Sequence, residues 1–145
     1  ILTAIGQAVE KGSCTGLQEI HFHKNRARGN DDGDELELDY LGALSNFGPV
    51  FHSLSLSQSE TMNISGLQAC KNLRTLNLSY TKVADVSVLR SCSRLHTLDL
   101  RHTQVADISV LGSCSSLHTL HLDGTQVADV SMLGSCSSLH TLDLS

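Results

Sequence analysis

Histidine and cysteine, two common metal ligands, recur at one fixed interval along the second half of the chain. The histidines of this series are His96, His118 and His140, each twenty-two residues after the last. If these histidines follow neighbouring strands of a sheet, their rings lie about 4.8 Å apart. A column of imidazoles at this spacing could bind a transition metal or respond to pH. No acidic or supporting arrangement is visible around them, and duplication of a unit copies its histidine without any chemical need. We therefore expect no metal at this column.

The cysteines follow the same interval and raise the question of a disulfide or a zinc site. The repeated members are Cys70, Cys92, Cys114 and Cys136. Common zinc sites take ligands that are paired closely in sequence, and the chain has no Cys-x-x-Cys pair. Each cysteine instead stands three residues before the next repeated leucine, where a small apolar side chain would pack. The sequence therefore predicts a column of buried free thiols, which fits a reducing compartment and a cytoplasmic location.

Composition and charge argue against several function classes. The 145 residues carry a formal net charge of −5 and 3% aromatic side chains, so they offer no general attraction for nucleic acid or an anionic membrane. A basic cluster at 21–28 is followed at once by an acidic one at 31–39, which indicates a solvated loop. No run is apolar enough to span a membrane. Aspartate, histidine and serine recur as columns rather than converging on one pocket, so we expect neither an enzyme nor a cofactor.

The elements that must position these columns come from a repeat of twenty-two residues. Residues 95–116 read LHTLDLRHTQVADISVLGSCSS and residues 117–138 read LHTLHLDGTQVADVSMLGSCSS, with five differences. We number the places of each unit from its first leucine, so that leucines occupy places one, four and six. Alternation along a strand sends the leucines of places four and six to one side and the residue between them to the other. Such a strand is unstable alone, but stacked copies form a parallel sheet over a shared apolar interior.

Units that open with the LxxLxL pattern begin at Phe51, Leu73, Leu95, Leu117 and Leu139, the first with phenylalanine in place of leucine. This pattern resembles the leucine-rich repeat family, whose units run LxxLxLxxNxL over twenty to twenty-nine residues. The resemblance covers residues 51–145 and implies an α/β solenoid. Its curved parallel sheet would lie on the concave side, with short turns, 3₁₀ or helical segments on the convex side. Units of twenty-two residues leave room there for little more than a turn or a short 3₁₀ segment.

Two polar places are expected to hold the turn that follows each strand. The family's asparagine is replaced in these units by threonine, as at Thr103, whose hydroxyl donates a single hydrogen bond to a backbone carbonyl. An aspartate follows four residues later, at Asp107 and its counterparts Asp85 and Asp129. We expect each aspartate to cap the next apolar segment through local backbone contacts.

The N-terminal third keeps the pattern less strictly. The residues at the LxxLxLxxN spacing are Leu17, Ile20, Phe22 and Asn25. We interpret residues 1–50 as irregular units with an inserted loop near 26–40, and residues 51–145 as the regular repeats of the same leucine-rich repeat domain. An alternative makes residues 36–38 a further strand, but it requires unusually short units. Neither end shows the polar capping unit that a solenoid needs, so we expect the chain to be a fragment of a longer protein.

The differences between the two near-identical units fall mainly at places that face away from the leucines. Unlike polar residues are exchanged at places five, seven and eight, while the other two differences swap apolar residues. In a solenoid these polar places lie on the concave surface, which such proteins generally use for binding. Interfaces favour tyrosine and arginine as anchors, so we expect Tyr80 and Arg101 to anchor a protein partner. The predicted site comprises Asn77, Tyr80, Asp99, Arg101, His102, His121 and Asp123.

A finer resemblance bears on function. Threonine at the ladder place, the VADVS motif and a cysteine three residues before the next leucine resemble leucine-rich repeats of trypanosomatid proteins, a type named as adenylate cyclase regulatory proteins. We expect a non-catalytic, regulatory scaffold that binds a partner protein through its concave face. An alternative is the substrate-recognition part of an F-box-like ubiquitin-ligase complex, although those repeats are longer and carry cysteine where this chain has Thr103. A third interpretation is a solvated face that binds no ligand in this part of the solenoid.

Overall fold

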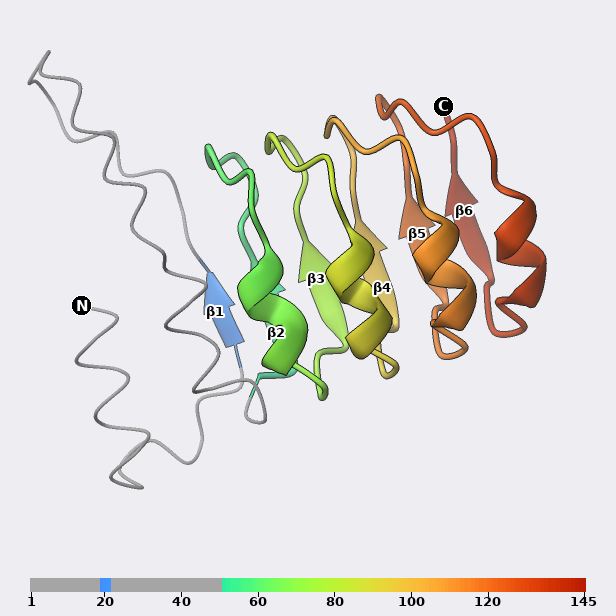
Figure 1. Cartoon of the computed structure of the whole chain (residues 1–145), viewed down its shortest axis with the longest axis horizontal. Coiled ribbons are helices and arrows are strands. Elements are labelled where there is room, and N and C mark those ends of the chain that lie inside the picture. Colours follow the sequence, from blue (N-terminus) through green and yellow to red (C-terminus); the bar gives the residue numbers. More distant parts are fainter. Residues whose placement is uncertain (1–18, 22–50) are drawn as a thin grey trace, which may run out of the picture.

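The structure is a computed structural model that describes residues 19–21 and 51–145. These residues contain six strands that pair in parallel and follow one another in the order of the sequence. The strands are β1 (Glu19–His21), β2 (Ser53–Ser55), β3 (Thr75–Asn77), β4 (Thr97–Asp99), β5 (Thr119–His121) and β6 (Thr141–Asp143). Figure 1 shows the strands side by side along the long axis of the molecule. The parallel sheet of stacked units that the sequence predicts is therefore confirmed.

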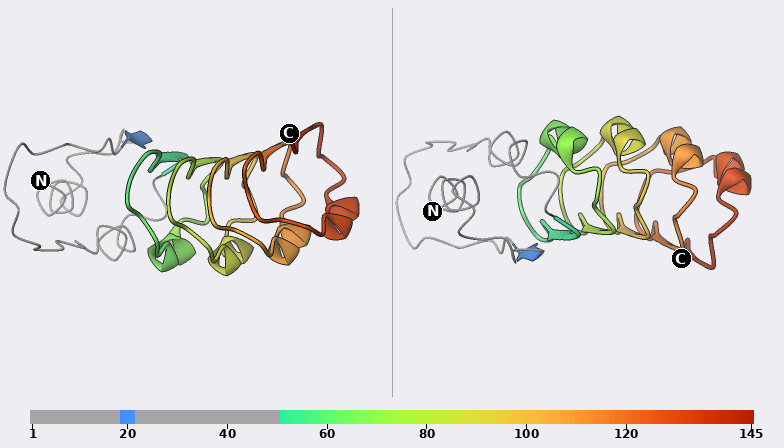
Figure 2. Two further views of the ribbon diagram at one scale, coloured as in Figure 1. Left: turned by 90° about the horizontal axis from the view of Figure 1, so that it is seen from above. Right: turned by 90° about the horizontal axis from the view of Figure 1, so that it is seen from below.

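A short 3₁₀ segment connects each successive pair of strands from β2 to β6. These segments are η1 (Ser65–Ala69), η2 (Ser87–Ser91), η3 (Ser109–Ser113) and η4 (Ser131–Ser135). They lie on the side of the stack opposite the sheet, and they spread more widely than the strands do (Figure 2). The sheet therefore occupies the concave side, and the 3₁₀ segments occupy the convex side, as predicted.

An aspartate precedes each of the last three 3₁₀ segments and caps it. The Oδ1 atom of Asp107 accepts a hydrogen bond from the backbone N–H of Ser109 at 2.8 Å, and Asp85 and Asp129 make the same bond at the start of η2 and η4. These bonds stabilise the ionised carboxylates and lower the pKa of each aspartate below its ordinary value. The predicted capping role is confirmed.

The repeated leucines form one apolar interior between the sheet and the 3₁₀ segments. The sheet register pairs Leu76 with Leu98 and Leu98 with Leu120, so each side chain packs against its own counterpart. Leu98, Leu100 and Leu120 are fully buried, and Leu122 is 3% exposed. Burial of a leucine side chain contributes about 1.5–3 kcal/mol to the free energy of folding. This explains why leucine recurs at these places in every regular unit while other places vary.

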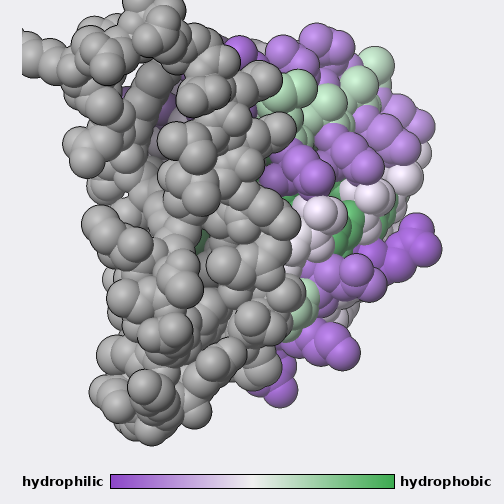
Figure 3. Space-filling view, turned by 60° about the vertical axis from the view of Figure 1, so that its left-hand side comes forward, coloured by the Kyte–Doolittle hydropathy of each residue, from purple (hydrophilic) through white to green (hydrophobic). Residues whose placement is uncertain are grey.

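The leucines of the last strand differ from the others. Leu142 and Leu144 are 39% and 56% exposed, because no unit stacks on their outer side in the described chain. On the face seen in Figure 3, side chains of like hydropathy form bands that cross successive units. Each place in the repeat therefore forms a continuous row on the surface or in the interior.

The cysteines form the buried column that the sequence predicts. Cys70, Cys92, Cys114 and Cys136 are free and buried. The Sγ–H of each of the last three donates to a leucine carbonyl twenty-five residues earlier, at 3.8, 3.7 and 3.2 Å. Burial raises the pKa of Cys70 to about 11 and that of Cys92 to about 12. These thiols are therefore neutral packing groups in the folded chain.

The turns after β3, β4 and β5 are each held by a threonine and by a left-handed backbone. The hydroxyl of Thr103 donates to the carbonyl of Leu100 at 2.7 Å, and the threonines of the neighbouring units make the same bond. Place eight then adopts a positive φ in four successive units, at Gln58, Tyr80, His102 and Gly124. The turn therefore fixes the direction in which each side chain at place eight leaves the backbone.

In the N-terminal third, only β1 is described. It pairs directly with β2 and aligns Ile20 with Leu54, the register that the leucine pattern predicts. The inserted loop near 26–40, the alternative strand at 36–38, the acidic cluster at 31–39 and all of the basic cluster at 21–28 except His21 lie outside the described residues. These interpretations therefore stay predictions.

Candidate functional site

Places five, seven and eight of three neighbouring units come together on the concave side of the sheet. The sheet register aligns Asn77 with Asp99 and Asp99 with His121 at place five. Arg101 and Asp123 follow at place seven, two residues after the ends of β4 and β5. We call the seven predicted residues the sheet-face site: Asn77, Tyr80, Asp99, Arg101, His102, His121 and Asp123. The structure places all seven on adjacent units, but their contacts divide them into distinct roles.

Asp99 is the residue whose environment differs most from expectation. The sequence places it on an outward contact surface, yet it is only 6% exposed. Arg101 folds back over it: Nη2 lies 2.6 Å from Oδ2, and Nε lies 3.0 Å from Oδ1. Asp99 therefore lies on the predicted face but beneath the side chain of Arg101, which covers its carboxylate in the free chain. Its direct contact with a partner stays a prediction.

The pairing fixes Arg101 rather than hiding it. Its side chain remains 43% exposed, while that of Asp99 is 9% exposed. Asp99 also accepts a hydrogen bond from the backbone N–H of Arg101 at 3.0 Å, so one carboxylate holds both the turn and the guanidinium group. The hydrogen bonds and the negative charge of Asp99 raise the pKa of Arg101 further. Arg101 is a permanently charged group held in one orientation.

The bond from place five to place seven recurs in other units. Asn77 accepts from the backbone N–H and the hydroxyl of Ser79 at 2.9 and 2.7 Å, and Asp143 accepts from the hydroxyl of Ser145 at 2.7 Å. These are local turns of the Asx type. The Oδ1 atom of Asn77 is therefore occupied by Ser79, and through it Asn77 supports the exit of its strand.

His121 stands where the other units have an acceptor, and it breaks this pattern. Its Nδ1 atom is buried and makes no hydrogen bond among the described residues. It lies 3.8 Å from Oδ2 of Asp143, the residue at the same place of the next unit. Hydrogen bonds from Ser145 are the main cause that lowers the pKa of Asp143, and His121 adds to the effect. The sequence prediction missed Asp143, although its place in the repeat beside His121 was a sufficient signal.

Tyr80, His102 and Gly124 form a row at place eight. The rings of Tyr80 and His102 stack with centroids 4.5 Å apart. The ring of His102 in turn covers Gly124, where an added Cβ would lie 2.4 Å from its Nδ1. The Nε2 atom of His102 lies 3.4 Å from Oδ2 of Asp123. The absence of a side chain at residue 124 therefore gives His102 its position, and His102 supports one face of the Tyr80 ring.

The resulting surface suits recognition rather than reaction. Tyr80 is 55% exposed and, like Arg101, is held by a neighbouring side chain. Aromatic and guanidinium groups fixed in this way lose little conformational entropy when they are buried by a partner. Among the described residues, no three histidine, cysteine, aspartate or glutamate side chains are grouped so that they could hold a metal ion.

The histidine column lies outside the sheet-face site, at place two. The rings of His96 and His118 stack with centroids 4.8 Å apart, and those of His118 and His140 stack at 5.1 Å. The predicted spacing is confirmed. The residue at this place in the unit before is Arg74, whose carbonyl accepts a hydrogen bond from the backbone N–H of His96.

Comparisons with known proteins agree with this geometry. A family model described as "Leucine Rich repeats (2 copies)" matches residues 71–113 and 93–133. The crystal structure of an internalin C2 from Listeria monocytogenes superposes with a TM-score of 0.68 at 33% sequence identity. The chain folds as a leucine-rich repeat solenoid. The superposition covers 75% of this chain but 46% of the internalin chain, so this chain spans less than half of that relative.

The leucine-rich repeat assignment carries a general function. Proteins with these repeats generally act in protein–protein interaction, and the fold is typically a non-catalytic scaffold. No curated protein matches the chain. Nothing in the comparisons supports the F-box-like alternative or assigns the repeats to the trypanosomatid type. Within the described residues of this leucine-rich repeat solenoid, no helix is both long and apolar enough to cross a membrane.

Proposed function

We propose that the chain is a non-catalytic scaffold that binds a partner protein through the concave face of its sheet. The single observation that supports this most is the pair of exposed, side-chain-held anchors Tyr80 and Arg101 on neighbouring units. Tyrosine and arginine are the residues that most often dominate the binding energy of protein interfaces. Fixed anchors of this kind bind with a smaller entropic cost than mobile surface side chains do.

The contacts assign different parts to the members of the sheet-face site. Tyr80 and Arg101 would enter the partner's surface, because each is a large, partly exposed group that a neighbouring side chain holds in place. Asp99 and His102 would act as positioning residues, since they hold these two anchors from below and from the side. Asp123 is partly exposed, and it would contribute a polar rim.

The proposal also covers the compartment of the protein, the extent of its solenoid and its regulatory role. Four buried, unpaired thiols in successive units suit a reducing compartment, which favours the cytoplasm. The proposal also includes residues 1–50 in the same solenoid as irregular units. A regulatory role follows from the resemblance in sequence, and it requires a partner whose activity changes on binding.

A site-specific crosslink tests the surface directly. Tyr80→p-benzoylphenylalanine places a photoreactive ring at the proposed anchor, and Met62→p-benzoylphenylalanine places the same ring elsewhere on the solenoid at matched exposure, 58% against 55%. After irradiation in an extract of the source cells, we expect one protein to crosslink from residue 80 and not from residue 62. Mass spectrometry of the crosslinked band identifies it.

Alanine variants then measure the energy of each anchor. With the identified partner purified, Tyr80→Ala and Arg101→Ala should each weaken binding at least about tenfold, since dominant interface residues carry that much or more. Arg90→Ala is the matched control, because Arg90 is an exposed arginine on the convex segment η2. Equal affinity of all three variants, with unchanged circular dichroism spectra, would contradict the proposal.

A further inference from the structure

Positive and negative charges occupy opposite edges of the regular units. Within residues 51–145, every carboxylate lies on a strand or in the stretch between a strand and the next 3₁₀ segment. The stretch that leads from each 3₁₀ segment into the next strand contains no carboxylate but carries Lys71, Arg74 and Arg94. We call this stretch, with the residues of place two, the lead-in edge; it is the lower edge in Figure 1.

Among the described residues, two cations after the strands, Lys82 and Arg101, pair with acids, while those of the lead-in edge form no ion pair. Lys82 binds Glu60 at 2.7 Å, and Arg101 binds Asp99 at 2.6 Å. Arg74, in contrast, is exposed and makes no side-chain hydrogen bond or ion pair with a described residue. Arg94 donates from Nη1 to the neutral amide oxygen of Asn72 at 2.9 Å, which orients its guanidinium group without neutralising it.

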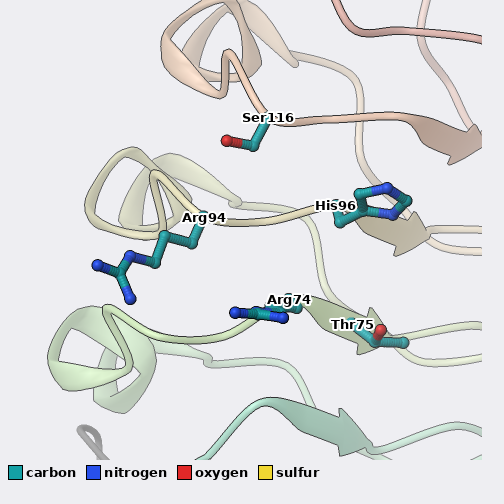
Figure 4. Close-up of a pocket in the computed structure, with 5 residues that line it drawn as sticks. All are labelled: Arg74, Thr75, Arg94, His96 and Ser116. Atoms are coloured by element: carbon teal, nitrogen blue, oxygen red, sulfur yellow. The ribbon is translucent and has the colours of Figure 1, made fainter.

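The two arginines border one open hollow between neighbouring units. Its lining consists of Arg74, Thr75, Arg94, His96 and Ser116. Figure 4 shows the side chain of Arg94 extending toward the level of Arg74, with the ring of His96 at the other side of the gap. All five side chains can donate hydrogen bonds, and none carries a negative charge. Such a set matches the oxygen atoms of an anion.

The histidine column extends this donor row along the stack. Arg74 and His96 are neighbours at place two, and His118 and His140 continue the row with ring stacking at 4.8 and 5.1 Å. His118, in the middle of the column, has a stacked ring on each face, so it presents the edge of its ring to a ligand. A linear row of donors over several units suits a chain of negative groups better than a single compact ion.

We propose that the lead-in edge is a second interaction surface, which binds an acidic polypeptide segment. The unpaired cations supply charge complementarity, and a guanidinium group fits a planar carboxylate through two parallel hydrogen bonds. Nucleic acid fits less well, because single strands bind through stacking on free aromatic faces, and the histidine rings of this edge stack on one another instead. The surface is separate from the sheet-face site, so the two can be tested independently.

The test measures fluorescence anisotropy of a labelled peptide of eight glutamates against the whole chain at low salt. We expect binding that weakens with added salt, and no binding of the matching eight-glutamine peptide. Arg74→Gln should weaken binding about tenfold, since it removes a charge-assisted hydrogen bond. Arg94→Gln should act in the same direction. Lys82→Gln is the control: it removes the same charge from the opposite edge and should leave the affinity unchanged.

Three outcomes would overturn the proposal. The first is no binding of the glutamate peptide at about millimolar protein. The second is an equal loss with Arg74→Gln and Lys82→Gln, which would show only the effect of net charge, or a loss confined to Arg101→Gln, which would assign the peptide to the sheet face. The third is binding of a labelled eight-uridine RNA that depends on Arg74 while the peptide does not bind. Circular dichroism of each variant confirms that the exposed substitutions leave the fold intact.

Discussion

The guanidinium group of Arg101 covers the carboxylate of Asp99, with Nη2 2.6 Å from Oδ2 and Nε 3.0 Å from Oδ1. The same carboxylate accepts the backbone N–H of Arg101, and so a single buried aspartate both closes the turn and orients an exposed cation. Asn77 closes the corresponding turn one unit earlier with an uncharged amide. In both units an acceptor closes the turn, but only Asp99 also supplies a negative charge. Comparison of the two units therefore distinguishes the effect of the acceptor from that of the charge.

Substitutions at Asp99 should reveal these two roles. Asp99→Asn keeps an acceptor for the turn, as Asn77 does naturally, and should lower the free energy of unfolding by less than about 1 kcal/mol. Asp99→Ala leaves the backbone N–H and the guanidinium group without their acceptor and should cost about 1–2 kcal/mol. Urea unfolding of the two variants measures the difference. Equal costs would mean that the turn does not depend on this acceptor.

Gly124 is expected to be the least replaceable of the described glycines. Its φ is +64°, and an added Cβ would lie 2.4 Å from Nδ1 of His102, so Gly124→Ala strains the backbone and displaces the ring. The left-handed conformation alone costs an alanine about 1–2 kcal/mol. Thermal unfolding should show this loss, and the ring resonances of Tyr80 should shift as the stacking with His102 is lost.

Gly134→Ala is the matched control for that experiment. No atom lies within 4 Å of a Cβ added at residue 134, so the substitution meets no neighbour. It should change the free energy of unfolding by no more than about 0.5 kcal/mol. A similar loss at both glycines would show that the contact with His102 is not the cause.

The buried thiols make the stability of the chain fall in alkaline solution. Thiols of the unfolded chain lose their protons near pH 9, while burial raises the pKa of Cys70 to about 11 and that of Cys92 to about 12. Between these values the unfolded state binds fewer protons than the folded state, so the free energy of unfolding decreases as the pH rises. Urea unfolding in reductant at pH 8 and pH 10 checks the sign. Cys92→Ala should flatten the dependence, and an unchanged slope would contradict the assignment.

The capping aspartates make stability fall at acid pH. The backbone N–H groups of Ser87, Ser109 and Ser131 lower the pKa of Asp85, Asp107 and Asp129 below their ordinary value of 3.8. Their contribution is present above that value and is lost as the pH falls through the lowered pKa values. Thermal unfolding from pH 5 to pH 2 measures the loss. The triple variant D85N/D107N/D129N keeps the acceptors without the charge, and it should show a shallower dependence than the unaltered chain.

The stacked units, the leucine interior and the thiol column could be predicted from the sequence because each depends on the period alone. Leu98 packs on Leu120 in whatever way the intervening turn is built. The burial of Asp99 could not be predicted in the same way, since it depends on the rotamer by which Arg101 folds back over the strand. The support of His102 by Gly124 was also missed, because it depends on the left-handed turn shared by place eight. Asp143 and Arg74 could have been selected from the sequence, because each stands next to a histidine in a column of the repeat. Asp143 stands next to His121, and Arg74 stands next to His96.

The segregation of carboxylates from the lead-in cations has a consequence before any contact is made. It gives the repeats an electric moment that runs along the strands, perpendicular to the axis along which the units stack. Within about 8 Å in physiological salt, such a moment turns an approaching charged molecule so that it meets the edge of opposite charge first. Adding further units of the same sequence would lengthen the lead-in edge and the opposite, acidic edge together. The torque that orients a long charged ligand would therefore grow with each added unit.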